Sequence, residues 1–370
     1  MKIALVTPYF PPNIGGIETY VCELANRLAK DNDVYVFTCG RGIVETRGRV
    51  TIFRLRALDV QNLPVSPKIP YPIPSSMMFK IARSNVDVIH AHGHAFMTSF
   101  HAALASRITH KPFVLTVHDI GVAYRDYRIM RGIRPIVDST LVNFIFKHSD
   151  VVIAQNNVTY RYSLRFNPKN IVIIPQGIDC QRFSPAEDGE YVTFFAARLV
   201  PQKGGEIFIR AVPHVLEQIG DAKFRVIGDG YQRSFLENLS KKLGVRDHID
   251  FSGRVPHELI PSYLGTANVV VFPSEIPTGL SLLEAAAMRK PIITTDNEWA
   301  RDALGDAPLY IPGRSPAETA EAIIHLLSNP EERTRMSQLA YDKVIPERDW
   351  NSVVSKHLEL YDNIVKNGAA

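Results

Sequence analysis

"YVTFFAARLVPQKGG" spans residues 191–205 and decides the fold that the sequence predicts. Its first part is a nearly continuous run of apolar and β-branched residues up to Leu199, which is typical of a strand buried on both faces. A turn follows, and Gly204 and Gly205 then open a segment with a helical pattern. A strand that passes through a glycine turn into a helix is the repeating unit of a doubly wound α/β sheet.

The same alternation continues on both sides of this stretch. The pattern predicts buried strands at residues 2–8, 33–38, 87–92, 113–118, 150–155 and 171–177, and again at 191–199, 223–228, 248–255, 267–274, 290–296 and 307–313. The polar stretch 177–190 interrupts the rhythm and is typical of a linker. We therefore expect two Rossmann-like doubly wound domains that face each other across a cleft, with bounds at 1–180 and 190–345, and a terminal helix at 346–370 that packs back onto the first domain.

Composition narrows the class of protein. A chain of 370 residues is long enough for two hydrophobic cores, and 45% hydrophobic with 22% charged residues is typical of globular domains. The net charge of +4 is a mild excess that does not indicate nucleic-acid binding, which usually goes with a clustered patch on a strongly basic domain, although it suits an anionic ligand. Cys22, Cys39 and Cys180 form no metal or disulfide spacing, which favours a reducing, cytoplasmic location. No run approaches 18 apolar residues, so no membrane span is expected, while contact with a membrane surface stays open.

"NIGGIE" (13–18) lies between the first predicted strand and the first predicted helix. Gly15 and Gly16 would leave no side chain between the backbone and a ligand, and glycine also permits a positive φ. The free amides and the dipole at the helix start attract an anion, above all a diphosphate. A tight turn that only leads into a helix explains the same residues equally well.

Arg198 and Lys203 follow the first strand of the second half and lie five positions apart across a turn. Two cations near a helix start could neutralise the charge of a leaving diphosphate, and hydrogen bonds to charged groups contribute about 1.5–3 kcal/mol each. The alternative is a pair of solvated side chains on a loop. The binding interpretation is favoured because each half of the chain carries a glycine loop at the same place.

"PSEIPTGLSLLEAAA" (273–287) places Gly279, Leu280 and Ser281 at the start of another helix. Free amides there can hold sugar hydroxyls or phosphate. Glu284 lies about one turn further on and could accept hydrogen bonds from a ribose diol. Alternatively, Glu284 is only an acid stabilised by the helix dipole, by about 0.3–1 kcal/mol.

With "TVHD" (116–119), "IPQGID…F" (174–183), "VIGDG" (226–230) and "FSGRV" (251–255), these motifs resemble glycosyltransferase family 4 along essentially the whole chain. This resemblance implies a retaining, metal-independent transferase with the two-domain GT-B fold, for which a nucleotide sugar is a substrate and no cofactor is needed. It also implies roles for individual residues. Gly15 and Gly16 would approach the donor phosphates, Arg198 and Lys203 would bind the diphosphate, Glu284 would hold the ribose, the backbone of Gly279, Leu280 and Ser281 would contact phosphate or sugar, Arg254 and Val255 would border the base, and His118 would lie beside the donor sugar.

One motif departs from the family. Members usually carry two acids with seven residues between them, but the position that matches relative to Glu284 holds Ile276, and the acid Glu275 comes one residue earlier. Thr278 stands where an aromatic residue is common. Either a one-residue bulge returns Glu275 to the catalytic position, or the role of the first acid is lost.

His118 ends a predicted strand, where α/β sheets place ligands. It could hydrogen-bond the donor sugar or stabilise a positive sugar, because a histidine changes charge near neutral pH; an ordinary strand-end histidine is the alternative. His90 and His92 share one face of a strand, yet no carboxylate or cysteine joins them, so a metal site is not favoured.

Four arginines, Arg125, Arg128, Arg131 and Arg134, recur every three residues. On a helix they would spread over roughly half of the circumference, a surface suited to anionic lipid headgroups or an anionic acceptor. A solvated helix or loop explains them as well.

The sequence thus predicts a hexosyltransferase that moves a sugar from a UDP-sugar to a hydroxyl of a membrane lipid or a glycan, in the cytoplasm or at the inner face of the membrane. Peripheral contact with the membrane goes with the lipid acceptor. Two alternatives remain open: a nucleotide-sugar 2-epimerase, and a catalytically silent relative that binds a nucleotide or a partner.

Overall fold

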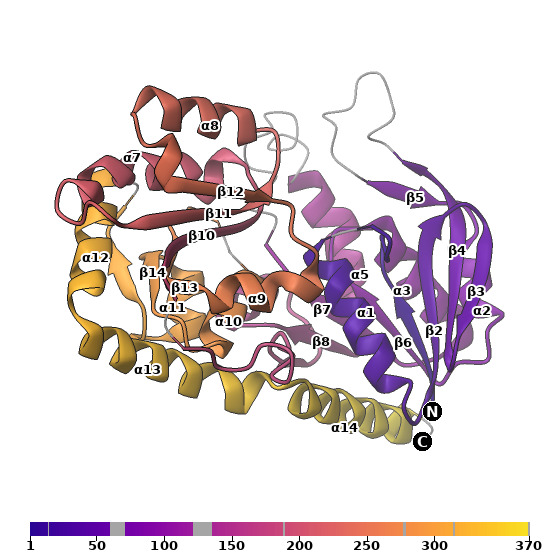
Figure 1. Cartoon of the computed structure of the whole chain (residues 1–370). Coiled ribbons are helices and arrows are strands. Elements are labelled where there is room, and N and C mark those ends of the chain that lie inside the picture. Colours follow the sequence, from indigo (N-terminus) through magenta and orange to yellow (C-terminus); the bar gives the residue numbers. More distant parts are fainter. Residues whose placement is uncertain are drawn as a thin grey trace. The chain divides into compact units, whose positions relative to one another are not determined.

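The computed structural model describes residues 1–13, 15–59, 71–120, 135–187, 189–276, 279–313 and 315–368. The chain divides into two compact units, one of Met1–Gln176 with Asn351–Ala370 and the other of Gly177–Trp350. In Figure 1 the first unit runs from indigo to magenta and ends with the yellow terminal helix.

The sheet of the first unit is ordered β3-β4-β2-β1-β6-β7-β8-β9, and β5 also pairs with β4. Its strands are β1 (Lys2–Val6), β2 (Asp33–Gly40), β3 (Ile43–Arg47), β4 (Val50–Asp59), β5 (Pro72–Pro74), β6 (Val88–His92), β7 (Phe113–Val117), β8 (Val151–Ala154) and β9 (Ile171–Ile173). In the order β4-β2-β1-β6-β7-β8-β9, all neighbouring strands are parallel. The two remaining strands, β3 and β5, run antiparallel to β4. The order reverses between β1 and β6, which makes this pair the topological switch point of the unit.

Helices cover both faces of this sheet. They are α1 (Gly16–Leu28), α2 (Met77–Ala82), α3 (Met97–Thr109), the π-helical turn η3 (Asp138–Val142), α5 (Asn143–His148), α6 (Asn157–Leu164) and α14 (Trp350–Gly368). Residues of α2, α3 and α5 join Ile89 and Leu115 in the hydrophobic core on one face. On the other face, side chains of α1 and α14 meet, since the Tyr20 hydroxyl lies 3.4 Å from Nε2 of His357.

The sheet of the second unit is ordered β12-β11-β10-β13-β14-β15, and its neighbouring strands are parallel. The strands are β10 (Tyr191–Arg198), β11 (Lys223–Asp229), β12 (Ile249–Gly253), β13 (Ala267–Phe272), β14 (Ile292–Thr295) and β15 (Leu309–Ile311). Counted along the chain, this is the Rossmann order 3-2-1-4-5-6, with the switch point between β10 and β13.

Two hydrophobic cores lie on the two faces of this second sheet. The helices are α7 (Gly205–Leu216), α8 (Arg233–Lys242), α9 (Ile260–Gly265), α10 (Leu280–Ala287), α11 (Glu298–Leu304), α12 (Pro316–Ser328) and α13 (Pro330–Arg348), with short turns η4 (Pro201–Lys203), η5 (Arg246–His248) and η6 (His257–Leu259). Phe194 belongs to the core with residues of α7, α8 and α12 on one face, whereas Phe195 belongs to the core with residues of α9, α10 and α11 on the other. Complete burial of such a side chain contributes about 1.5–3 kcal/mol to the stability of the fold. Successive residues of β10 therefore stabilise the packing of helices on opposite faces of the sheet.

The predicted fold class is confirmed: each unit is an α/β sheet of mainly parallel strands covered by helices on both faces. The β3–β4 hairpin was not predicted. Ile43 and Val44 of β3 are exposed at the sheet edge and alternate with polar residues, so this strand lacks the continuous apolar run of a buried strand. Within the described ranges, every helix is too short or too polar to cross a membrane.

Candidate functional site

Two neighbouring strands of the second unit present polar residues where they end. Arg198 is the last residue of β10, and Ser274 and Glu275 follow β13. These strands flank the switch point, and in open α/β sheets ligands bind outside the carboxyl ends of the strands at this place. The second sheet therefore has a candidate ligand site at its β10–β13 edge.

Two cationic residues lie at or just after the end of β10. The Arg198 side chain is exposed, while Lys203 is half-buried in η4. Burial, and then the positive charge of nearby Arg198, lower the pKa of Lys203 to about 8. Two like charges held close together are stabilised by an anion that contacts both, so a diphosphate fits the pair.

The turn that carries Lys203 is fastened to the segment after β13. The backbone N–H of Glu275 donates to the carbonyl oxygen of Gln202 at 3.0 Å, and Ser274 Oγ donates to the same oxygen at 3.2 Å. Gly204 has a φ of +79°, and an added Cβ there would overlap the carbonyl oxygen of Pro273. The structure thus brings the two predicted motifs, 197–205 and 273–287, together, and it explains why a glycine follows Lys203.

The predicted first acid and the helix start lie on the same segment. Glu275 is exposed, and Gly279, with a φ of +60°, directly precedes α10 in a backbone conformation that favours glycine. Leu280 is half-buried and Ser281 is buried in the first turn of that helix. Residues 277–278 lie outside the described residues, so the bulge expected to realign Glu275 stays a prediction.

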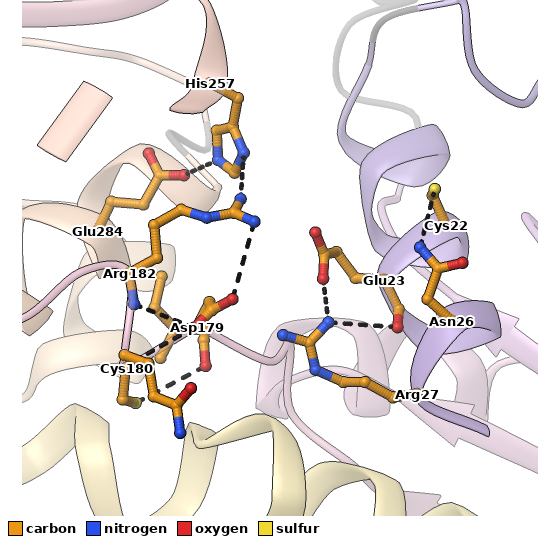
Figure 2. A network of polar contacts seen from close by, with 11 residues as sticks. Cys22, Glu23, Asn26, Arg27, Asp179, Cys180, Arg182, His257 and Glu284 are labelled. Atoms are coloured by element: carbon orange, nitrogen blue, oxygen red, sulfur yellow. Dashed lines mark hydrogen bonds and ion pairs between the residues drawn. The ribbon is translucent and has the colours of Figure 1, made fainter. Parts of the chain in front are cut away.

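Glu284 lies in α10 and is only 3% exposed. Its Oε1 is 2.8 Å from Nε2 of His257, whose Nδ1 is 3.0 Å from a guanidinium nitrogen of Arg182. Arg182 also pairs with Asp179 at 3.9 Å, and Figure 2 shows His257 between the Glu284 carboxylate and the Arg182 guanidinium. Sequence reasoning missed His257 and Arg182, because no spacing rule relates either of them to Glu284.

Arg254 and Val255 follow β12 directly. Arg254 is exposed, whereas Val255 is half-buried against the core on the α10 face. His257 comes shortly after them and contacts Glu284. The segment predicted to border the base and the carboxylate predicted to hold the ribose are therefore joined through one side chain.

In the first unit, Gly15 and Gly16 follow β1 at its switch point. Gly15 has an extended backbone, with φ −177° and ψ 170°, so it does not use the positive φ that glycine permits. The Glu18 carboxylate occupies the space where a Gly15 side chain would stand, whereas at Gly16 no described atom other than those of its chain neighbours and the α1 backbone lies within 4 Å of the corresponding position. Gly16 is thus the residue of this loop that leaves room for a ligand.

His118 directly follows β7 and is half-buried. Its Nδ1 is 3.1 Å from Oε1 of Gln155, its Nε2 is 3.2 Å from Nδ1 of His92, and its ring meets that of Tyr20 edge-on at 5.1 Å. Burial lowers the pKa of His118 to about 4. The expected change of charge near neutral pH is therefore wrong for this structure: His118 is neutral there.

His118 belongs to a group that we call the histidine cluster, made of His90, His92, His118 and His357 with Tyr20 and Tyr361. The rings of His90 and His92 are 4.2 Å apart, as expected for alternate residues of β6. The nitrogens of His90 are each 2.6 Å from a hydroxyl, that of Tyr361 and that of Thr116. Burial lowers the pKa of His90 and His92, and that of His357 to about 4.

In the part of the chain that the structure describes, no three His, Cys, Asp or Glu side chains are grouped so as to hold a metal ion. The four arginines predicted to form a basic surface, Arg125, Arg128, Arg131 and Arg134, lie outside the described residues. Their role stays a prediction.

Comparison with known protein families gives matches in both units. The family described as "Glycosyltransferase Family 4" matches residues 14–182, and "Glycosyl transferases group 1" matches residues 178–343. A protein of Mycolicibacterium smegmatis named "GDP-mannose-dependent alpha-(1-6)-phosphatidylinositol monomannoside mannosyltransferase" is 24% identical over 96% of this chain and 97% of its own.

Solved structures match the fold over nearly the whole chain. Sucrose-phosphate synthase from Thermosynechococcus elongatus superposes with a TM-score of 0.79 and 21% identity, covering 99% of each chain. Anabaena HepE in complex with UDP-glucose gives a TM-score of 0.76 and 17% identity, covering 98% of this chain and 100% of its own. The two-sheet architecture is therefore shared with the GT-B fold.

Proposed function

The chain belongs to the glycosyltransferases with a GT-B fold, with a family 4 first half and a group 1 second half, and from this premise we propose that it moves a hexose from a UDP-sugar to an acceptor hydroxyl. The observation that carries the proposal is the pair of cations at the β10–β13 edge of the second sheet. The charge of Arg198 lowers the pKa of Lys203 there, and a diphosphate that contacts both cations would favour the charged form of each.

The reaction breaks the bond between the anomeric carbon and the diphosphate oxygen and forms a bond from that carbon to the acceptor oxygen. Negative charge grows on the diphosphate as it leaves, and preformed cations at that place stabilise the transition state. Arg198 and Lys203 supply this stabilisation without a divalent metal. The acceptor proton passes to the departing phosphate on the same face of the sugar, which retains the anomeric configuration.

The remaining residues divide the donor among them. Glu284 accepts hydrogen bonds from the ribose diol, Arg254 and Val255 border the base, and the backbone of residues 279–281 contacts the phosphate or sugar. In the first unit, Gly16 leaves space for the donor phosphates. Neutral His118 hydrogen-bonds the donor sugar.

The acceptor is a hydroxyl of a lipid or a glycan. The mycobacterial relative is named for a phosphatidylinositol mannoside acceptor, which supports the lipid alternative. Arg125, Arg128, Arg131 and Arg134 would then contact anionic headgroups at the cytoplasmic surface of the membrane. Co-sedimentation with phosphatidylglycerol vesicles tests this part of the proposal: a variant with all four arginines changed to Ser should pellet less than the wild type, and equal pelleting would dismiss the membrane role.

A binding panel tests the central proposal. UDP, GDP, ADP and UMP are compared for the rise in melting temperature that each gives to the wild type and to Lys203→Met. A nucleotide at a hundred times its Kd raises stability by about 2.7 kcal/mol. We expect UDP to stabilise the wild type most, and the effect to fall sharply in Lys203→Met; stabilisation by none of the diphosphates would end the proposal.

Product analysis separates the enzymes that share this architecture. The protein is incubated with UDP-[¹⁴C]glucose, and with GDP-[¹⁴C]mannose in parallel, with and without a membrane lipid extract. A glycosylated product with the anomeric configuration retained supports the transferase. A free epimeric sugar formed without an acceptor would identify a 2-epimerase, and tight binding without turnover would identify a silent relative.

A further inference from the structure

The strongest unexplained feature of the second unit is the histidine that contacts the buried acid of α10. His257 begins η6, four residues after the end of β12, and 36% of its side-chain surface is exposed to solvent. Glu284 keeps only 4% of its side-chain exposure. A buried carboxylate needs hydrogen-bond donors, and His257 provides one at 2.8 Å.

The partners of His257 determine which of its nitrogens carries the proton. A guanidinium group has only donors, so the Arg182 nitrogen 3.0 Å from Nδ1 must donate to it. Nδ1 is therefore the acceptor of a neutral ring, and the proton sits on Nε2. Nε2–H then donates to Oε1 of Glu284, and an ionised carboxylate can only accept hydrogen bonds.

Arg182 is itself held in place. Its guanidinium pairs with Asp179 at 3.9 Å, and its backbone N–H donates to Oδ1 of Asp179 at 3.1 Å. The neighbouring Phe183 is buried, and its ring centre lies 5.6 Å from that of His257. The "GIDCQRF" stretch thus fixes both the position and the tautomer of the histidine.

The contact with His257 restricts how the Glu284 carboxylate can turn, because it engages Oε1 at 2.8 Å. With Oε1 bound to His257, the side chain has one orientation for accepting further hydrogen bonds, and the hydroxyls of a ribose are the groups that the proposed function brings to it. Two hydrogen bonds from a diol need an acceptor held at a fixed angle, because misaligned hydrogen bonds weaken steeply. The same side chain also joins Glu284 to the segment of Arg254 and Val255.

We propose that His257 is a positioning residue that orients Glu284 toward the ribose of the donor and thereby makes the site select ribonucleotides over 2′-deoxyribonucleotides, with Arg182 fixing its tautomer. This inference rests on the proposed function, since it assumes that a nucleoside diphosphate binds beside Glu284. It assigns His257 no contact with the reacting atoms.

The test is the ratio of dissociation constants for 2′-deoxy-UDP and UDP, measured by calorimetry, with dGDP and GDP in parallel. A hydrogen bond to a charged acceptor contributes about 1.5–3 kcal/mol, so the wild type should prefer the ribonucleotide by about 10- to 100-fold. In His257→Phe, which keeps the aromatic ring and removes both nitrogens, the ratio should fall to within about threefold. A general loss of stability would weaken both ligands alike and leave the ratio unchanged.

Two further variants and one control test the same role of His257. His257→Gln offers an amide N–H to Glu284 and an oxygen to Arg182, so it should restore most of the selectivity. Arg182→Met keeps the histidine and frees its tautomer, so the ratio should fall part of the way, which gives an independent reading if His257→Phe does not fold. His248→Phe, a change at an exposed histidine of η5, is the matched control and should keep the wild-type ratio.

The outcomes distinguish a failure of the proposed function from a failure of the role of His257. If the wild type binds no nucleoside diphosphate, the proposed function fails and takes this inference with it. If the wild type prefers UDP over its deoxy form and both His257→Phe and Arg182→Met keep that preference, only the role of His257 is overturned. A ratio lost in His257→Phe and regained in His257→Gln supports it.

Discussion

Each unit places a histidine after a strand of its sheet, and the two histidines have opposite kinds of neighbours. His118 lies among an amide, a second imidazole and a phenol ring, all of them neutral. His257 lies between a guanidinium and a carboxylate. The side chains that contact His118 are thus neutral, and the charge of Asp119 raises its pKa less than burial lowers it, whereas His257 contacts two groups of fixed charge.

This difference agrees with the roles proposed for the residues of each unit. A diphosphate and its ribose are best held by cations and an oriented carboxylate, which the second unit supplies with Arg198, Lys203 and Glu284. A sugar ring is neutral and is best held by neutral hydrogen-bonding groups. Four experiments test whether the two units differ in this way.

The largest effect is expected from removing the charge of Lys203. Lys203→Met should lower kcat/KM by about 10²–10³, because a preformed group that stabilises developing charge contributes about that much. The melting temperature at pH 7 should stay the same or rise, since the lowered pKa means that the fold disfavours the charged lysine. Steady-state kinetics and calorimetry measure both quantities. Lys241→Met, on the exposed side of α8, is the control, and equal losses in the two variants would remove Lys203 from the site.

The neutral histidine cluster should reveal itself in the pH dependence of stability. The folded pKa of His357 is about 4, below an ordinary value of 6.5, so the unfolded chain binds more protons between these pH values. Stability is therefore full above pH 6.5 and falls as the pH drops toward 4, by about 3 kcal/mol for this residue. Urea unfolding at pH 7, 6 and 5 measures the slope.

His357→Gln should flatten that slope, and His214→Gln, at an exposed position of α7, should leave it unchanged. If all three proteins lose stability equally on acidification, the cluster is not the source. The burial of neutral histidines in the first unit would then contribute nothing to the pH dependence of stability, which would remove one side of the contrast.

The glycine loops of the two units should respond differently to alanine. Gly204→Ala combines a positive φ with overlap of the Pro273 carbonyl and should cost more than about 2 kcal/mol of stability. Gly16→Ala meets no neighbouring atom within 4 Å at the start of α1 and should be neutral or stabilise by up to about 1 kcal/mol. If Gly16 lies against the donor phosphates, its variant should still bind UDP at least about tenfold more weakly, by loss of a close approach that is independent of stability. Full affinity in Gly16→Ala would dismiss that contact.

The smallest effect concerns the pH dependence of nucleotide binding. Lys203 loses its proton as the pH rises through about 8, so UDP affinity should be about twofold lower at pH 8 than at pH 7 and about tenfold lower at pH 9. Lys203→Arg keeps its charge throughout and should bind equally at pH 7 and pH 9. A parallel decline in both proteins would show that another group titrates.

The strand pattern predicted most of the fold because buried parallel strands are continuous apolar runs. It also predicted that Arg198 and Lys203 belong to one edge, since a short turn connects them. Sequence alone could not reveal His257, because its contact with Glu284 depends on where β12 and α10 end in the second unit. Likewise, the neutrality of His118 follows from its packing, which the motif "TVHD" does not encode.

The second unit interrupts the first along the chain, and this has a consequence for how the protein is made. Residues 351–370 complete the unit that begins at Met1, and Tyr361 supplies the hydroxyl that meets His90. During synthesis from the N-terminus, residues 177–350 are made before α14, so the sheet of the first unit forms without this helix. We expect the surface that α14 covers to stay exposed in the nascent first unit until the second unit has been synthesised, so the first unit can complete its folding only after that.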